Sequence, residues 1–461
     1  MNWRLWTPRT FANLKKPVLL CVSASWCHWC HTMDKLVYAD KGIARFIARN
    51  FVAVRVDRDV RPDIDARYNV GGWPSTVVLA GDGEPVLAAT YVPKEKMLDF
   101  LREGLARVKV HEGKKRVRTV PHPASVSSPK LYAEIRRAYD SVNGGFGLEP
   151  KFPHLDVLEY LLYRCLVHQD SDALRMLDGS LSAMMSGELF DRVQGGFFRY
   201  ATHRNWTIPH FEKLLEDNAR LLVVYVRAFE LLGRKEYLLT VNKLLSFLFT
   251  VLYDRKSGLF FGSQDADEAF CRLPLEKRLR ARHPFVDKRV YLDGNAAVAL
   301  ALFEAARLEP DYRDVAVGLV DRLLARERVH SEDSTGVVLL RDVVYLLMAS
   351  VAAAMATSDK RYVRSAKGLA KELDAFWMKE GGFGDVVPVK RAFGRLRVPL
   401  RPVYENACAA LVLRALAQIT RDARYAEKGL RALKAVSGEA AQSGLDAATF
   451  ALALEEFGGR I

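Results

Sequence analysis

Cysteine is scarce in this chain, with six among 461 residues, at positions 21, 27, 30, 165, 271 and 408. Four of them stand singly in apolar segments, as buried free thiols do. So few cysteines exclude a scaffold held together by disulfides. The remaining two, Cys27 and Cys30, form one CxxC pair. In a reducing compartment such a pair indicates transient redox chemistry or a metal site.

The sequence also lacks a long apolar run. Its richest stretch, residues 343–355, is too short to cross a bilayer. Residues 1–4 lead into no apolar segment of the kind that a signal peptide carries. We therefore expect a cytoplasmic protein without a membrane partner.

Dense clusters of basic residues are almost absent, although the net charge is +14. Lysine and arginine are spread along predicted helices and interleaved with acids. Only residues 109–118 (KVHEGKKRVR) are densely basic, and they fall where a linker should be. A solvated linker explains them better than a nucleic-acid site, so nucleic acid is not an expected partner. No cofactor is predicted.

The first hundred or so residues carry the pattern of a small α/β domain. Strand patterns cover residues 17–22, 51–56, 75–80 and 84–90. The last two flank Gly81-Asp82-Gly83, which is typical of a hairpin turn. Helical patterns cover residues 8–15, 28–48, 61–69 and 94–107. This order predicts a thioredoxin-like domain over residues 1–108.

The CxxC pair follows the first predicted strand and opens a long helix. Free backbone N–H groups and the helix dipole at that point would stabilise a thiolate. We expect Cys27 to attack, Cys30 to resolve the mixed disulfide, and His28 to lower the pKa of Cys27 further. Pro74 stands where thioredoxin folds carry a cis-proline that faces the dithiol.

A metal site is the main alternative for this pair. Cys27, Cys30, His28 and His31 could supply zinc ligands. A structural zinc usually needs a second pair of ligands nearby, which this stretch lacks. A vestigial pair without activity is the third interpretation.

Beyond a linker at residues 109–128, nearly every segment shows a helical period. Gly-Gly-Phe recurs at 144–146, 195–197 and 381–383, with the variant Gly-Leu-Phe at 258–260. Similar helix starts also recur, as LEDNA, LDGNA and YENA at 215–219, 292–296 and 404–407. Six helical hairpins are predicted, at 129–168, 171–232, 236–308, 311–356, 360–420 and 422–457. They predict an (α/α)6 barrel over residues 129–461, with an open helical solenoid as the alternative.

Pro-His pairs stand just before the second helix of the first two hairpins, at 153–154 and 209–210. His154 and His210 should therefore lie at the same rim of the barrel. With Glu212 they are the candidate catalytic residues, because histidine and carboxylate groups can move protons. Candidate substrate ligands come from the surrounding loops and helix starts: Lys151, Arg199, Tyr200, Trp206, Asp217, Asp265, Asp267 and Glu405. Acids at helix starts can instead complement the helix dipole, so Glu216, Asp217 and Glu405 keep that simpler interpretation.

Together these motifs resemble the spermatogenesis-associated thioredoxin-domain family. The resemblance is carried by residues 27–33 (CHWCHTM), 56–65 (VDRDVRPDID), 71–74 (GGWP), 150–154 (PKFPH), 195–200 (GGFFRY), 209–213 (PHFEK) and 265–267 (DAD). It implies a thioredoxin-like domain joined to a barrel similar to N-acylglucosamine 2-epimerases, and hence a carbohydrate-type pocket. The chain is shorter than most members, is compressed between Tyr68 and Gly71, and continues after Asp267 into a basic stretch, 272–289.

Three functions stay open for the barrel beside a thiol–disulfide oxidoreductase. It could be a sugar epimerase or isomerase that acts through His210. It could be a non-catalytic module that binds a ligand or client protein for the dithiol. It could be a glycoside hydrolase, which needs two carboxyl groups at a fixed separation. The expected partners are a sugar-like small molecule and a protein that carries a thiol or disulfide.

Overall fold

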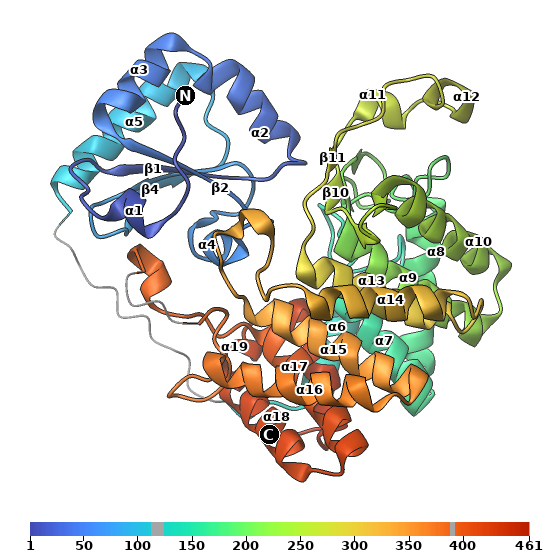
Figure 1. The fold of residues 1–461 in the computed structure, drawn as a ribbon. Helices are drawn as coiled ribbons and strands as arrows, with labels where there is room; N and C mark the ends of the chain where they lie inside the picture. The colour runs from blue at the N-terminus through green and yellow to red at the C-terminus, as the bar shows by residue number, and fades with distance from the viewer. Residues whose placement is uncertain (112–123, 388–391, 461) are drawn as a thin grey trace. The chain divides into compact units, whose positions relative to one another are not determined.

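The computed structural model describes residues 1–111, 124–387 and 392–460. The chain divides into two compact units, drawn in Figure 1. The first comprises Met1–Val120, His330–Val337 and Val386–Leu400, and the second comprises Pro121–Val329, Val338–Asp385 and Arg401–Ile461. The predicted basic linker falls largely on residues 112–123, outside the described residues.

The first unit contains a four-stranded sheet in the order β2-β1-β3-β4. Its strands are β1 Val18–Ser23, β2 Val52–Asp57, β3 Ser75–Leu79 and β4 Pro85–Ala89. β1 runs parallel to β2 and antiparallel to β3, and β3 and β4 form the predicted hairpin. The helices are α1 Pro8–Phe11, α2 His28–Met33, α3 Lys41–Asn50, α4 Pro62–Tyr68 and α5 Lys94–Lys109. This is the mixed α/β arrangement predicted from the sequence.

The helix predicted over residues 28–48 is divided in two. α2 continues as one π-helical segment, Asp34–Tyr38, and then stops. Asp40 begins α3, because its Oδ1 accepts the backbone N–H groups of Gly42 at 2.8 Å and Ile43 at 3.0 Å. An aspartate that caps a new helix in this way competes with continuation of the old one.

One face of this sheet is completed by residues from far along the chain. Phe393 and Leu396 belong to the same buried cluster as Val18, Leu20 and Val22 of β1. The ring of Phe393 also stacks on that of Phe11, with centroids 4.1 Å apart. The first unit therefore draws part of its core from outside residues 1–108, where the sequence placed the whole domain.

Polar contacts hold the same distant segment in place. The guanidinium of Arg67 donates to the backbone carbonyls of Arg395 at 3.1 Å and Val398 at 2.9 Å. The side chain of Arg395 in turn pairs with Glu84 at 3.0 Å. Because Arg67 is buried, these carbonyls satisfy a charge that would otherwise be costly to bury.

Substituting Phe393→Ala should destabilise the first unit by about 3 kcal/mol, the usual cost of removing a buried aromatic ring. Denaturant unfolding followed by tryptophan fluorescence would measure the loss, since Trp6 lies beside Phe393. Val398→Ala is the control, because Val398 is 50% exposed. Equal unfolding midpoints for the two variants would contradict the role of this segment in the core.

The second unit consists mainly of two rings of helices. The inner ring is α7 Leu155–His168, α9 Leu215–Leu232, α13 Leu292–Ala305, α15 Leu340–Thr357, α17 Val403–Thr420 and α20 Ala448–Glu456. Each inner helix packs on the next, and α20 packs on α7. The outer helices are α6 Ser128–Ala138, α8 Ser171–Ser186, α10 Lys235–Phe247, α14 Tyr312–Ala325, α16 Lys360–Glu372 and α18 Ala423–Ala435. The ring closes, which decides for the (α/α)6 barrel and against the open solenoid.

One helix in the described part of the chain is long and apolar enough to cross a membrane. This is α15, with a mean hydropathy of 1.4. Because 67% of its 18 residues are buried inside the protein, the helix has the character of a core element.

A buried asparagine fastens each of three inner helices to the loop before it. The Oδ1 of Asn218 accepts the N–H of Phe197 at 2.7 Å, and its Nδ2 donates to the carbonyl of the same residue at 3.1 Å. Asn295 makes both bonds to Phe260, and Asn406 makes both to Phe383. These contacts explain why Phe loops and Asn-Ala helix starts recur together in the sequence.

Candidate functional site

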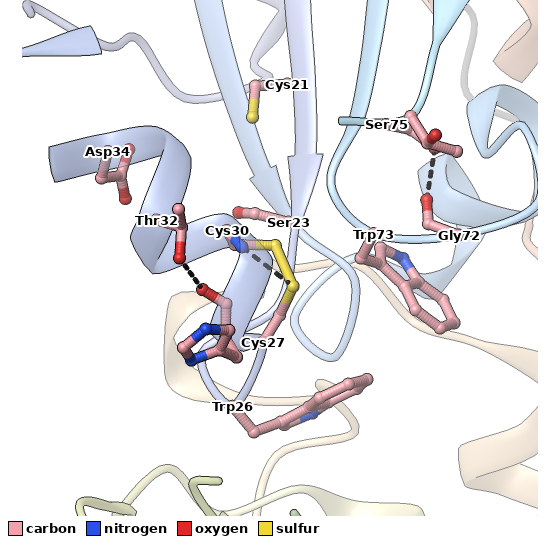
Figure 2. Close-up of a disulfide and its surroundings, with 12 residues drawn as sticks. Cys21, Ser23, Trp26, Cys27, Cys30, Thr32, Asp34, Gly72, Trp73 and Ser75 are labelled. Carbon is pink, nitrogen blue, oxygen red and sulfur yellow. Dashed lines mark hydrogen bonds between the residues drawn. A yellow bond between two sulfur atoms is a disulfide. The ribbon is translucent and has the colours of Figure 1, made fainter. Parts of the chain in front are cut away.

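The dithiol lies at the start of α2 and is oxidised in this structure. Cys27 and Cys30 form a disulfide, drawn in Figure 2, with 5.2 Å between their Cα atoms. The Sγ of Cys27 accepts the backbone N–H of Cys30 at 3.2 Å. Cys27 is 6% exposed and Cys30 is 3% exposed. An N–H aimed at Cys27 is the contact that would stabilise its thiolate after reduction.

The loop before β3 has the conformation that the sequence predicted. The Trp73–Pro74 peptide bond is cis. Figure 2 shows Gly72 and Trp73 of this loop, and Ser75 at the start of β3, among the surroundings of the disulfide; the Ser75 hydroxyl donates to the Gly72 carbonyl at 2.7 Å.

Two tryptophans beside the dithiol are held by carboxylates. The indole N–H of Trp26 donates to Asp59 at 2.5 Å, and that of Trp73 donates to Asp65 at 2.8 Å. The two rings meet edge to face, with centroids 5.6 Å apart, and the Arg58 guanidinium lies 4.9 Å from the Trp73 ring. Residues 56–65 were singled out from the sequence only as a family motif, and holding these indoles is a role that the sequence did not reveal.

His28 is the first residue of α2 and its side chain is exposed. Its ring meets that of Trp29 edge to face at 5.6 Å. An effect of His28 on the pKa of Cys27 therefore stays a prediction. The zinc alternative required both sulfur atoms as ligands, and here they are bonded to one another.

Charged side chains from several inner helices meet inside the barrel. Arg220 of α9 pairs with Asp156 and, at 2.8 Å, with Glu159, both on α7. Arg341 of α15 pairs with Glu216 of α9 at 2.7 Å. Since α13 lies between α9 and α15 in the ring, this second pair joins two helices that are not neighbours.

Tyrosines and further acids extend this network, which we call the lumen cluster: Asp156, Glu159, Glu216, Arg220, Asp293, Arg341, Tyr345, Tyr404 and Glu405. Tyr345 donates to Glu216 at 2.7 Å, and its hydroxyl lies 2.8 Å from that of Tyr404. Burial raises the pKa values of Glu159 and Glu405, against the opposing effects of Arg220 and Arg341 respectively. Carboxyls with raised pKa values are suited to hold and release protons.

Sequence reasoning found only the acids of this cluster that begin helices. It missed Asp156, Glu159, Arg220, Arg341 and the two tyrosines. Their signal was present, because they are polar residues spaced three or four apart on otherwise apolar helices. Such spacing places them on one helix face.

The two predicted histidines belong to one row of aromatic rings at the rim. The ring of His210 stacks on Tyr200 with centroids 4.2 Å apart, and Tyr200 stacks on Phe152 at 4.6 Å. Phe152 in turn meets His154 at 6.5 Å. Strand pairing makes this possible, because β5 Tyr200–Ala201 and β6 Pro209–His210 place Tyr200 opposite His210.

Glu212 and Arg199 form an ion pair beside this row. The Arg199 Nε lies 2.6 Å from Glu212 Oε1, and Nδ1 of His210 lies 3.8 Å from the same oxygen. Glu212 is only 3% exposed. Burial lowers the pKa of His154, which favours the neutral imidazole.

Two predicted substrate ligands, Lys151 and Trp206, use their polar atoms in hydrogen bonds within the protein. Lys151 is fully buried, and its ammonium donates to Asp140 at 2.7 Å and to the Gly147 carbonyl at 3.0 Å. Trp206 is 1% exposed, and its indole N–H donates to the Asn143 carbonyl at 2.9 Å. The polar atom of each side chain is therefore engaged within the protein, while Trp206 also lines a cavity together with Asn143, Glu188 and Arg192.

The remaining predicted ligands are spread around the rim. Asp217 is half-buried in the first turn of α9, and Glu405 occupies the first turn of α17. Asp265 accepts the N–H of Ala266 at 2.8 Å. Asp267 caps the short helix α11 Glu268–Cys271 by accepting the N–H of Phe270 at 2.9 Å. For Asp267 the structure thus supplies the capping role that acids at helix starts often have.

Lys213, the last residue of the PHFEK motif, repeats the arrangement of Lys151. It is fully buried and lies 2.8 Å from Asp191. Substituting Lys213→Met should therefore destabilise the barrel by about 3–5 kcal/mol, because it leaves a buried carboxylate with one cationic partner fewer. Unfolding followed by circular dichroism at 222 nm would measure this, with the exposed Lys235→Met as control. Unchanged stability would show that Lys213 is not a structural clamp.

The fold and these sites define a class: a thioredoxin-like domain joined to an (α/α)6 barrel of the kind found in sugar epimerases. Residues 1–115 match the family Thioredox_DsbH, described as "Protein of unknown function, DUF255". The chain is 34% identical to spermatogenesis-associated protein 20 of Mus musculus over 307 residues, which are 58% of this chain and 39% of that protein. The resemblance inferred from the motifs is thus confirmed. The aligned region spans well under half the length of that relative.

The barrel has relatives of its own. Cellobiose 2-epimerase of Bacteroides fragilis is 29% identical over 131 residues, covering 28% of this chain and 30% of that protein. Among solved structures, a D-mannose isomerase superposes with a TM-score of 0.54 at 14% identity, over 67% of this chain and 83% of that one. The structure of cellobiose 2-epimerase from Bacillus thermoamylovorans B4167 also superposes with a TM-score of 0.54. Its identity is 11%, over 67% of this chain and 86% of that one. At these identities the structures establish the fold of the barrel.

Proposed function

We propose that the Cys27–Cys30 pair is a thiol–disulfide exchange centre. The observation that carries this proposal is the disulfide at the start of α2, in which Cys27 accepts the Cys30 N–H at 3.2 Å. In the reducing direction, the Cys27 thiolate attacks a client disulfide and releases one client thiolate. The Cys30 thiolate then attacks Cys27 Sγ and releases the second, so that two electrons pass to the client. The proposed partner is a protein thiol or disulfide in the cytoplasm.

Equilibration with mixtures of reduced and oxidised glutathione tests this function. The wild type should pass reversibly between dithiol and disulfide, as counted by alkylation and mass measurement. Cys27→Ser and Cys30→Ser should both lose the transition. Cys21→Ser should keep it, because Cys21 is buried and burial raises the pKa of its thiol, which makes it unreactive. A pair that stays reduced at every glutathione ratio would contradict the proposal.

For the barrel we propose a site for a sugar-like molecule, with epimerase or isomerase chemistry. The specific observation is the row of His154, Phe152, Tyr200 and His210 at the rim. His210, whose Nδ1 lies 3.8 Å from the buried Glu212 carboxylate, is able to exchange a proton with a carbon next to a carbonyl. The similarity to a cellobiose 2-epimerase and to the fold of a D-mannose isomerase supports this assignment.

The test is turnover of D-mannose, D-glucose and cellobiose by the wild type and by His210→Ala. The variant should lose about 10²–10⁴-fold in rate, as expected for removal of a general acid or base. His203→Ala is the matched control, because His203 belongs to the same loop and its side chain is 48% exposed. Binding without turnover would favour the non-catalytic module, and hydrolysis of cellobiose would favour the glycosidase.

A further inference from the structure

One histidine far along the chain contacts the redox half of the protein. His330 follows α14 in sequence but belongs to the first compact unit. It is 3% exposed, and its Nε2 lies 2.7 Å from the backbone carbonyl of Asp59, 271 positions away. Because a carbonyl oxygen only accepts hydrogen bonds, Nε2 must carry the proton.

The loop that carries His330 is tightly built. The backbone N–H of His330 donates to the Val337 carbonyl at 3.2 Å. Between them the Ser331 N–H donates to Ser334 Oγ at 3.3 Å, and the Ser334 hydroxyl donates to the Ser331 carbonyl at 2.6 Å. The imidazole is therefore carried by a loop that these hydrogen bonds close.

Asp59 connects this imidazole to the dithiol. Its backbone N–H donates to Asp57 at 2.9 Å, its carbonyl accepts His330, and its carboxylate accepts the Trp26 indole N–H at 2.5 Å. Trp26 is 1% exposed and directly precedes Cys27. The contacts thus run without interruption from His330 through Asp59 to Trp26.

We propose that His330 is a positioning residue for the redox centre, acting on Cys27 through Asp59 and Trp26. The proposal rests on the proposed exchange function of the dithiol. Its physical basis is that a hydrogen bond to the Asp59 carbonyl holds the aspartate in place, and the aspartate holds Trp26 against the start of α2. Loss of the bond releases Trp26 and uncovers Cys27.

Alkylation of the reduced protein by iodoacetamide measures this effect directly. His330→Leu removes the donor and should make Cys27 react about threefold faster or more, as one lost hydrogen bond allows. His330→Gln keeps an N–H donor at the same distance along the side chain and should restore nearly the wild-type rate. His111→Leu is the matched control, because His111 pairs with Asp82 in the turn between β3 and β4. Equal rates for His330→Leu and the wild type would overturn the proposal.

A double-mutant cycle with Trp26→Phe distinguishes a specific effect of His330 on Cys27 from a general loss of folding. If His330 acts through the indole N–H, adding His330→Leu to Trp26→Phe should leave the alkylation rate unchanged. A full further increase in that background would overturn the proposed route. Alkylation needs no redox partner, so these outcomes are separate from failure of the exchange function, which would appear as a wild-type pair inert toward glutathione.

Discussion

The barrel depends on a buried asparagine amide in the first turn of three inner helices. Each amide satisfies both the N–H and the carbonyl of one phenylalanine in the preceding loop, groups that would otherwise be buried without partners. The asparagine contact also limits which residues the preceding loop can hold. Gly196 has φ +77°, and a Cβ there would lie 2.7 Å from the Phe247 ring and 3.1 Å from Asn218 Oδ1. With the asparagine turned toward its loop, acids of the same first turn, such as Glu216 and Asp293, reach Arg341 in the lumen.

Within each barrel motif, some residues stabilise the fold and others are candidates for chemistry. In PKFPH and PHFEK the lysines are buried in ion pairs with Asp140 and Asp191, and they close the loops. The histidines of the same motifs are left at the rim, one at each end of a row of aromatic rings. Inside the barrel, Arg220 and Arg341 pair with acids of the inner helices, and burial raises the pKa values of Glu159 and Glu405.

The first unit is assembled from distant parts of the chain. Its sheet and its CxxC helix come from the N-terminal residues, but Phe393 completes one of its cores and His330 contacts Asp59. These residues flank the inner helices α15 and α17 in sequence. The first unit is therefore built from three separate stretches of the chain.

The amino-acid pattern alone was enough to predict the fold class, the dithiol at a helix start, the position of the cis-proline and the six hairpins. All of these follow from local chemistry: periodicity of apolar residues, turn residues, and short motifs that need only their neighbours. Other features of the protein appear only once the chain is folded: α20 packs on α7, Arg341 of α15 pairs with Glu216 of α9, Lys151 is buried against Asp140, and Phe393 and His330 belong to the first unit. The physical reason is that each of these contacts joins residues distant in sequence. Whether a charged side chain is buried, and which group it pairs with, depends on residues from distant parts of the chain that pack around it.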